Sequence, residues 1–160
     1  MNKLWILGVA LAAGLSWKLL RLKQSAEKLR VLLLPPRLPN VSGSMVSFPL
    51  TIQIDNHSDS RFVLEKLWVS IYLWNNSDWQ LVGGSAPVSD ASVIAPAATT
   101  KIQTSPRVSL TELIRFVSFD LFKPLDLIEK FKTLPVKLET NLKVSGISIT
   151  ESVVLNESSL

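Results

Sequence analysis

The sequence predicts a mainly β protein: an antiparallel β-sandwich of about seven strands with one internal helix, preceded by an N-terminal helix. Three observations predict it. Residues 4–17 carry no charge, as in a helix that enters a membrane. From Val46 onward, apolar residues recur at every second position, which is the period of a strand with one buried face. Turn-forming residues interrupt these runs about every ten residues, a spacing typical of sandwiches.

The N-terminal segment LWILGVALAAGLSW (4–17) predicts a single-pass membrane anchor. Extension to Leu20 adds only Lys18, whose stem can lie along lipid chains while its ammonium reaches the headgroups. A cleaved signal peptide, with its cleavage site at residues 10–12, and a helix buried against a partner protein are the alternatives. Apolar residues span the anchor and a tryptophan stands near each end: Leu4, Trp5, Ile6, Leu7, Val9, Leu11, Leu15 and Trp17.

Positive charge is concentrated directly after this segment. Of 17 basic residues, seven lie in the first 37 positions, where Glu27 is the only acid. Apolar residues at steps of three and four through residues 19–33 predict a basic amphipathic helix, on a membrane surface or packed on the body. The positive-inside rule then keeps the body on the cytoplasmic side. We call five of these residues the basic collar: Lys18, Arg21, Lys23, Lys28 and Arg30.

The first half of the body predicts three strands. Residues 29–34 either end the helix or form an additional first strand before Pro35 and Pro36. A strand over 46–55 places Phe48, Leu50, Ile52 and Ile54 on one face. Residues 62–74 are bulky on both faces, which favours a central strand with Leu67, Val69, Ile71 and Leu73 in the core. The turn NNSD leads into a strand over 79–87, where two glycines indicate a bulge or an edge.

The second half predicts three further strands around a helix. Residues 99–108 form a strand that Pro106 ends or places at an edge. Ser109 and Glu112 have the spacing of a capping box and open a helix over 109–119; a second helical turn follows over 125–131. Residues 134–146 and 147–155 form the last two strands, and residues 156–160 a frayed tail. Residues 29–155 thus predict one immunoglobulin-like sandwich after an N-terminal unit of residues 1–28.

The order of several motifs resembles the LEA type 2 (late embryogenesis abundant, WHy-type) family, in the form of a bacterial-like membrane-anchored member. The resemblance implies an immunoglobulin-like sandwich without catalytic residues, linked to desiccation or stress protection. It also implies that Asn56 is the family's turn asparagine, with His57 where a proline is common. The motifs are FPLTIQIDNHSDSRFVLEKLWVSIYL (48–73), LVGGSAP (81–87), VIAPAATTKIQ (93–103) and LPVKLETNLKVSGISI (134–149).

The residue types offer little for catalysis. The chain has no cysteine, which excludes thiol nucleophiles, disulfides and thiolate metal sites, and His57 is its only histidine. Asp55, His57 and Ser58 or Ser60 are too close in sequence to converge as a triad, so we interpret 55–60 as a turn. Asp55, Asp59 and Asp78 are too few for calcium. We therefore predict no enzyme activity, no cofactor and no metal site.

The aromatic residues of the central hairpin are the best candidate for an interaction face: Trp68, Tyr72, Trp74 and Trp79. We expect a non-enzymatic module that binds or stabilises at a membrane surface, with the bilayer and proteins or further copies of itself as partners. The near-neutral body predicts no nucleic-acid binding, and no small-molecule substrate is expected. The alternative is a minor structural protein of a virion or other membrane-containing assembly, which links an internal membrane to a shell through the sandwich.

Overall fold

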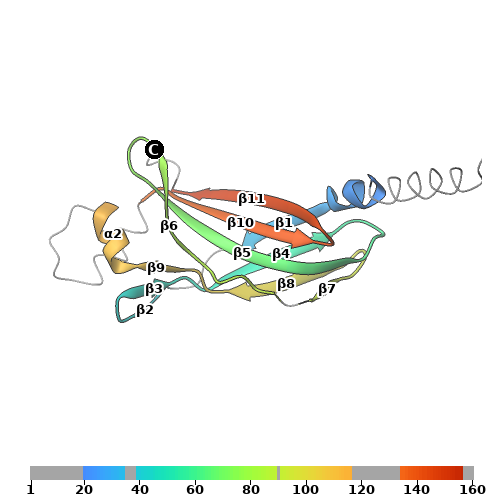
Figure 1. Ribbon diagram of the computed structural model, residues 1–160, viewed down its shortest axis with the longest axis horizontal. Helices are drawn as coiled ribbons and strands as arrows, with labels where there is room; N and C mark the ends of the chain where they lie inside the picture. Colours follow the sequence, from blue (N-terminus) through green and yellow to red (C-terminus); the bar gives the residue numbers. More distant parts are fainter. Residues whose placement is uncertain (1–19, 35–38, 90, 117–133, 157–160) are drawn as a thin grey trace, which may run out of the picture.

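The computed structural model describes residues 20–34, 39–89, 91–116 and 134–156 and shows an elongated, mainly β molecule built from two sheets (Figure 1). The predicted anchor, Lys18 and the predicted helical turn over 125–131 lie outside the described residues. Residues 20–26 are helical, and a turn at residues 27–28 connects them to the first strand. Within the described ranges, no helix combines the length and the apolar character that crossing a membrane requires.

The smaller sheet has three antiparallel strands in the order β1-β4-β8. They are β1 (Leu29–Leu34), β4 (Leu50–Asn56) and β8 (Thr99–Thr104). Residues 29–34 therefore form a strand and do not continue the helix. β1 pairs with β4 along its whole length, from Leu29 opposite Asn56 to Leu34 opposite Thr51.

The larger sheet has the order β11-β10-β5-β6-β9-β3-β2, and β7 pairs with the beginning of β5. β5 is central, as its bulky residues on both faces predicted. β11 is an edge strand. The strands are β2 (Asn40–Ser42), β3 (Met45–Ser47), β5 (Phe62–Trp74), β6 (Trp79–Gly84), β7 (Val93–Ile94), β9 (Arg107–Ser109), β10 (Val136–Val144) and β11 (Ile147–Leu155).

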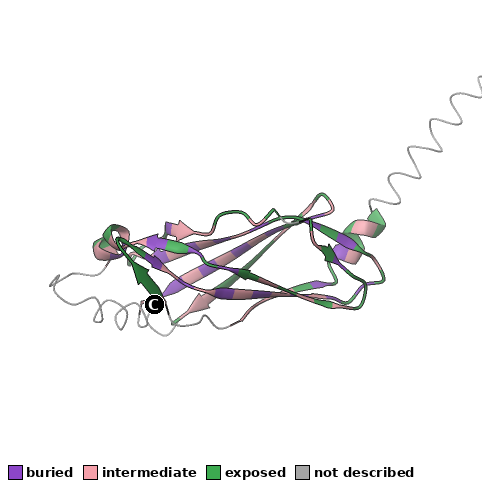
Figure 2. Cartoon of the chain, turned by 90° about the horizontal axis from the view of Figure 1, so that it is seen from below, coloured by how far each residue is buried: buried purple, intermediate pink, exposed green. Residues whose placement is uncertain are grey.

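The core lies between the two sheets, where the alternating apolar faces meet (Figure 2). The predicted inward residues of β5 and of β4 are buried, and β10 adds Val136, Leu138, Leu142 and Val144. Full burial of each such side chain stabilises the fold by about 1.5–3 kcal/mol. Within β5 the alternation fails once, at Glu65, which is an extra residue between the positions opposite Lys143 and Val144 of β10.

Two predicted strands are each divided by a proline. The run 46–55 becomes β3 and β4, separated at Pro49, and the run 99–108 becomes β8 and β9, separated at Pro106. The Phe48 N–H donates to the Pro106 carbonyl over 2.9 Å, so the two breaks lie side by side. Because proline has no N–H for a ladder, each run crosses between the sheets here. The first run passes from β3 in the large sheet to β4 in the small one, and the second from β8 in the small sheet to β9 in the large one. This division, together with the short strands β2 and β7, gives more segments than the seven predicted.

The internal helix α2 (Leu110–Phe116) begins where Ser109 predicted. The Ser109 Oγ accepts the N–H of Thr111 over 3.2 Å. Glu112 does not complete a capping box, because its carboxylate pairs with Arg115 at 3.0 Å. The predicted end of this helix, residues 117–119, lies outside the described residues.

The sequence predicted a bulge at Gly83 and Gly84, and the structure has it one residue earlier, at Val82. Ile71 pairs with Gly83 and Tyr72 with Leu81, which leaves Val82 as the extra residue of β6.

Candidate functional site

The turn after β4 contains a compact group of buried polar side chains. Asn56 and Ser58 are each only 2% exposed. Asn56 Oδ1 accepts hydrogen bonds from the N–H and the Oγ of Ser58, over 3.0 and 2.7 Å. Asn56 Nδ2 donates to the carbonyls of Ser60 and Ala95, over 2.8 and 2.9 Å. Both N–H groups and both acceptor positions of this amide are therefore hydrogen-bonded, so its burial costs little free energy.

The same turn joins segments that are far apart in the sequence. The Ala97 N–H donates to the Ser58 carbonyl, and the His57 N–H donates to the Lys28 carbonyl. The Ser60 Oγ donates to the Ser25 Oγ over 3.0 Å, which fastens the helical residues 20–26 to the body. The sequence indicated a turn here, and the structure shows that this turn closes one end of the sandwich.

The structure does not assemble a triad from Asp55, His57 and the serines. The Asp55 carboxylate accepts hydrogen bonds from Thr99 Oγ1 over 2.6 Å and from Gln53 Nε2 over 3.0 Å. These bonds, with a smaller contribution from His57, lower the pKa of Asp55 below its usual value. The His57 side chain is exposed, while the Ser58 hydroxyl is buried against Asn56.

The three aspartates considered for calcium do not come together. Asp55 lies at the end of the sandwich where β5 begins, and Asp78 lies in the hairpin where β5 ends. In the described part of the chain, no three His, Cys, Asp or Glu side chains are grouped so that they could hold a metal ion.

The predicted aromatic face is partly assembled at the other end of β5. Trp74 and Trp79 are neighbours across the β5–β6 pair, with ring centroids 5.3 Å apart and planes tilted by 60°. Lys137 Nζ lies 4.3 Å from the centroid of Tyr72 and 5.6 Å from that of Trp79, within cation–π range. Trp68 lies nearer the beginning of β5, opposite Asn141 of β10, and away from these three side chains. The structure therefore groups three of the four predicted residues and separates the fourth.

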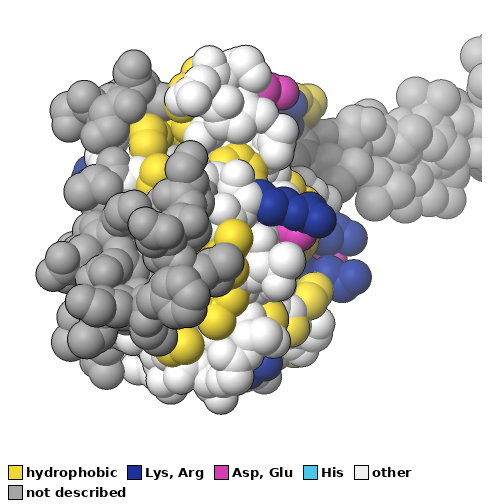
Figure 3. Space-filling view, turned by 90° about the vertical axis from the view of Figure 1, so that its left-hand side faces the viewer, with side chains coloured by type: hydrophobic (Ala, Val, Ile, Leu, Met, Phe, Trp, Pro, Cys, Tyr) yellow, Lys and Arg dark blue, Asp and Glu magenta, His cyan; other side chains and the backbone are white. Residues whose placement is uncertain are grey.

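Exposed apolar residues adjoin this cluster. Leu81, beside Tyr72 on β6, is 63% exposed. Seen from the end that carries α2, hydrophobic side chains are visible in several places on the surface (Figure 3). Val41 and Met45, in β2 and β3, are also exposed. Apolar side chains are therefore exposed at the end of the sandwich that carries the tryptophan pair.

The described part of the basic collar lies at the opposite end. Arg21, Lys23, Lys28 and Arg30 are all exposed, on the helical residues 20–26 and at the start of β1. Over residues 20–30 and 57–61, five basic residues stand against two acidic ones, so this end is positively charged.

The structure also shows a pocket that sequence reasoning missed. It lies beside β8 and has a volume of about 430 Å³, with Ser85, Thr104 and Arg107 among its lining residues. Thr104 is 9% exposed. The inward positions of β8 are Thr100, Ile102 and Thr104, and the signal available in the sequence was that two of these three are polar.

No family model and no curated protein matches the sequence. Solved structures of similar shape include a protein from Archaeoglobus fulgidus, at 11% identity and a TM-score of 0.48, which covers 79% of this chain and 89% of that one. The sporulation control protein Spo0M from Bacillus subtilis has 10% identity and a TM-score of 0.49, over 80% of this chain and 48% of that one. A protein assigned to the late embryogenesis abundant (LEA) proteins has 10% identity and a TM-score of 0.39, over 79% and 71%. At these values the comparisons assign neither a family nor an activity.

Proposed function

We propose that the chain is a non-enzymatic binding or stabilising module, an immunoglobulin-like sandwich of LEA type 2 character that is held at a membrane by residues 4–17. The membrane segment is a single pass, and the body lies on the cytoplasmic side. Proteins or further copies of the chain are bound at the aromatic end.

The observation that carries this proposal is the polarity of the molecule along its long axis. The helical residues 20–26 and the exposed collar cations lie at one end, directly after the predicted anchor. The Trp74–Trp79 pair lies at the far end of β5, twelve residues beyond its start at Phe62. At 3.3 Å per residue, the two ends of this strand are roughly 40 Å apart. A body tethered at the basic end therefore presents its aromatic end away from the bilayer.

The collar suits an acidic membrane surface. Cations next to a membrane segment are attracted to anionic headgroups, by about 1 kcal/mol for each lysine or arginine. Lys28 and Arg30 extend the positive charge from the helical residues onto β1, so the end of the sandwich itself faces the headgroups.

Carbonate washing of membranes from cells that express the full chain tests the anchor. The full chain should remain in the membrane pellet, and a chain without residues 4–17 should appear in the supernatant. Release of the full chain by carbonate would overturn the proposed anchor.

Flotation with vesicles tests the collar separately, using a chain without residues 1–19, which keeps every described residue. This chain should bind vesicles that contain phosphatidylserine and not vesicles of phosphatidylcholine alone. Four collar substitutions by glutamine, at Arg21, Lys23, Lys28 and Arg30, should weaken binding on the order of a hundredfold or more. The matched control carries four glutamines at exposed cations outside the collar: Lys66, Lys101, Arg115 and Lys143. Equal loss of binding in the two variants would show that only net charge matters and would refute a localised collar.

A further inference from the structure

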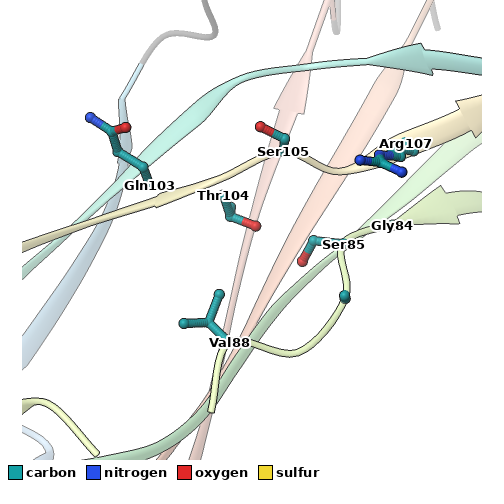
Figure 4. A pocket seen from close by; sticks show the side chains of 8 residues that line it. Gly84, Ser85, Val88, Gln103, Thr104, Ser105 and Arg107 are labelled. Carbon is teal, nitrogen blue, oxygen red and sulfur yellow. The ribbon is translucent and has the colours of Figure 1, made fainter. Parts of the chain in front are cut away.

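A second feature of the sandwich, unrelated to the tether, is the pocket beside β8. In the described part of the chain, β8 pairs with β4 alone, so its other side is a free edge of the small sheet. The chain that leaves β6 lies opposite this edge from Gly84 to Val88, and Val88 pairs with Leu67 of β5. The space between these two segments is the pocket of about 430 Å³ (Figure 4).

The hydroxyl of Thr104 is available for a ligand in this pocket. The residue is only 9% exposed, and its hydroxyl has no hydrogen-bond partner among the described residues. No fully buried side-chain nitrogen or oxygen in that part of the chain is left unpaired, so this hydroxyl must still be open to solvent. Figure 4 shows it directed into the pocket, toward Ser85. A ligand oxygen in the pocket would accept the hydrogen bond that the described residues leave unmade.

Ser85 faces Thr104 from the other wall and is held in place by β5. Its N–H donates to the Val69 carbonyl over 2.8 Å, and its Oγ accepts the Val69 N–H over 2.9 Å. Because the Oγ is already used as an acceptor, its own O–H remains free to donate into the pocket. The preceding Gly84 permits this close approach, since a Cβ there would lie 2.6 Å from the Val69 oxygen.

Arg107 supplies the charge. Its exposed side chain lines the pocket near Gly84, and the described residues that line the pocket include no aspartate or glutamate. Two hydroxyl donors and a guanidinium, with no carboxylate to compete, form a donor set suited to an oxyanion. Val88 lies below the two hydroxyls and gives the pocket an apolar floor.

We propose that this pocket binds a small organic anion through its carboxylate or phosphate group, which is held by Arg107, Ser85 and Thr104. The apolar part of the ligand then lies against Val88. The ligand is bound and not converted, so this proposal is independent of the proposed membrane tether.

Nuclear magnetic resonance of the full chain in detergent micelles tests the proposal. The probes are inorganic phosphate, acetate and butanoate, each compared with sodium chloride at equal ionic strength. We expect saturable shifts of the backbone amides of residues 84–88 and 103–107, and no saturable shift with chloride. A lower Kd for phosphate than for the carboxylates, or the reverse, shows which anionic group the pocket prefers. A lower Kd for butanoate than for acetate shows that the apolar part of the ligand contacts Val88. Absence of saturable shifts with all three probes would overturn the proposal.

Substitutions distinguish a ligand-binding hydroxyl from a structural one. Thr104→Val and Arg107→Gln should each raise the Kd for the bound probe about tenfold. Lys101→Gln removes an exposed cation from β8, the strand that carries Thr104, and should leave the Kd unchanged. Thr104→Val should keep or raise the Tm, because the lost hydroxyl has no hydrogen-bond partner in the described part of the chain. A lowered Tm with an unchanged Kd would mean that this hydroxyl serves the fold, and the proposal would then be wrong.

Discussion

Replacement of Asn56 by alanine is expected to destabilise the fold far more than the same replacement at Asn75. Both asparagines bind the serine two residues ahead in the same way, and Asn75 Oδ1 also accepts the N–H of Asp78 over 2.8 Å. Asn75 Oδ1 accepts from the N–H and the Oγ of Ser77, over 3.0 and 2.8 Å, as Asn56 Oδ1 does from Ser58. They differ in surroundings, because Asn75 lies in the exposed β5–β6 hairpin and Asn56 is buried.

The magnitude follows from the bonds that are lost. Asn56 makes four side-chain hydrogen bonds, and its Nδ2 is the donor for the carbonyls of Ser60 and Ala95. A hydrogen bond contributes about 1 kcal/mol net, and leaving a buried partner unpaired costs about 1–3 kcal/mol. Because these losses are not additive and water can enter the space, we expect Asn56→Ala to cost about 3 kcal/mol. In a domain of this size that lowers the Tm by about 10 °C. Asn75→Ala should cost at most about 1 kcal/mol.

Urea unfolding of the full chain in a non-ionic detergent, followed by tryptophan fluorescence, measures both variants. The two denaturation midpoints should differ clearly while the slopes stay equal to that of the wild type. If the free energies of unfolding of the two variants agreed within the error of the measurement, burial of the Asn56 turn would not be what stabilises this end of the sandwich.

Three further results are expected. Asn56→Asp places a carboxylate against two carbonyl oxygens, which raises the pKa of this carboxyl group in the folded state above its unfolded value of about 3.9. The free energy of unfolding, measured against pH, should therefore be larger near pH 4 than near pH 7. A free energy of unfolding that does not change with pH would contradict this. Thr99→Val removes the hydrogen bond that contributes most to the lowered pKa of Asp55. A carbon NMR titration should then give Asp55 a higher pKa. On acidification, the stability that the ionised carboxylate contributes should be lost at a higher pH than in the wild type. An unchanged pKa of Asp55 would show that other groups lower it. Gly84→Ala should cost about 1–3 kcal/mol in urea unfolding, because its Cβ would press on the Val69 carbonyl; unchanged stability would mean that β6 moves away freely.

The sequence predicted those parts of the fold that depend on local alternation. Leu67, Val69, Ile71 and Leu73 are buried as expected, since a period of two places them on one face whatever the partner strands are. The passage between sheets at Pro49 and Pro106 was not predicted. A proline shows that a ladder is interrupted, but which sheet the chain joins afterwards depends on contacts such as that between Phe48 and Pro106, far apart in sequence.

The candidate sites were predicted less completely for the same reason. Tyr72, Trp74 and Trp79 are joined by a short hairpin, so their proximity follows from local register. The pocket beside β8 was missed because Ser85 and Thr104 come from segments whose approach depends on the packing of the two sheets. The predicted anchor lies outside the described residues and remains a prediction.

The pairing of β1 has a mechanical consequence. β1 follows residues 20–26 after the turn at residues 27–28 and runs from them along the long axis of the sandwich (Figure 1). A pull on those residues along that axis would slide β1 past β4, and the six residue pairs between the strands would resist together. A pull across the axis would instead open the pairs one after another, starting with Leu29 and Asn56. The molecule should therefore withstand more force along its length than across it.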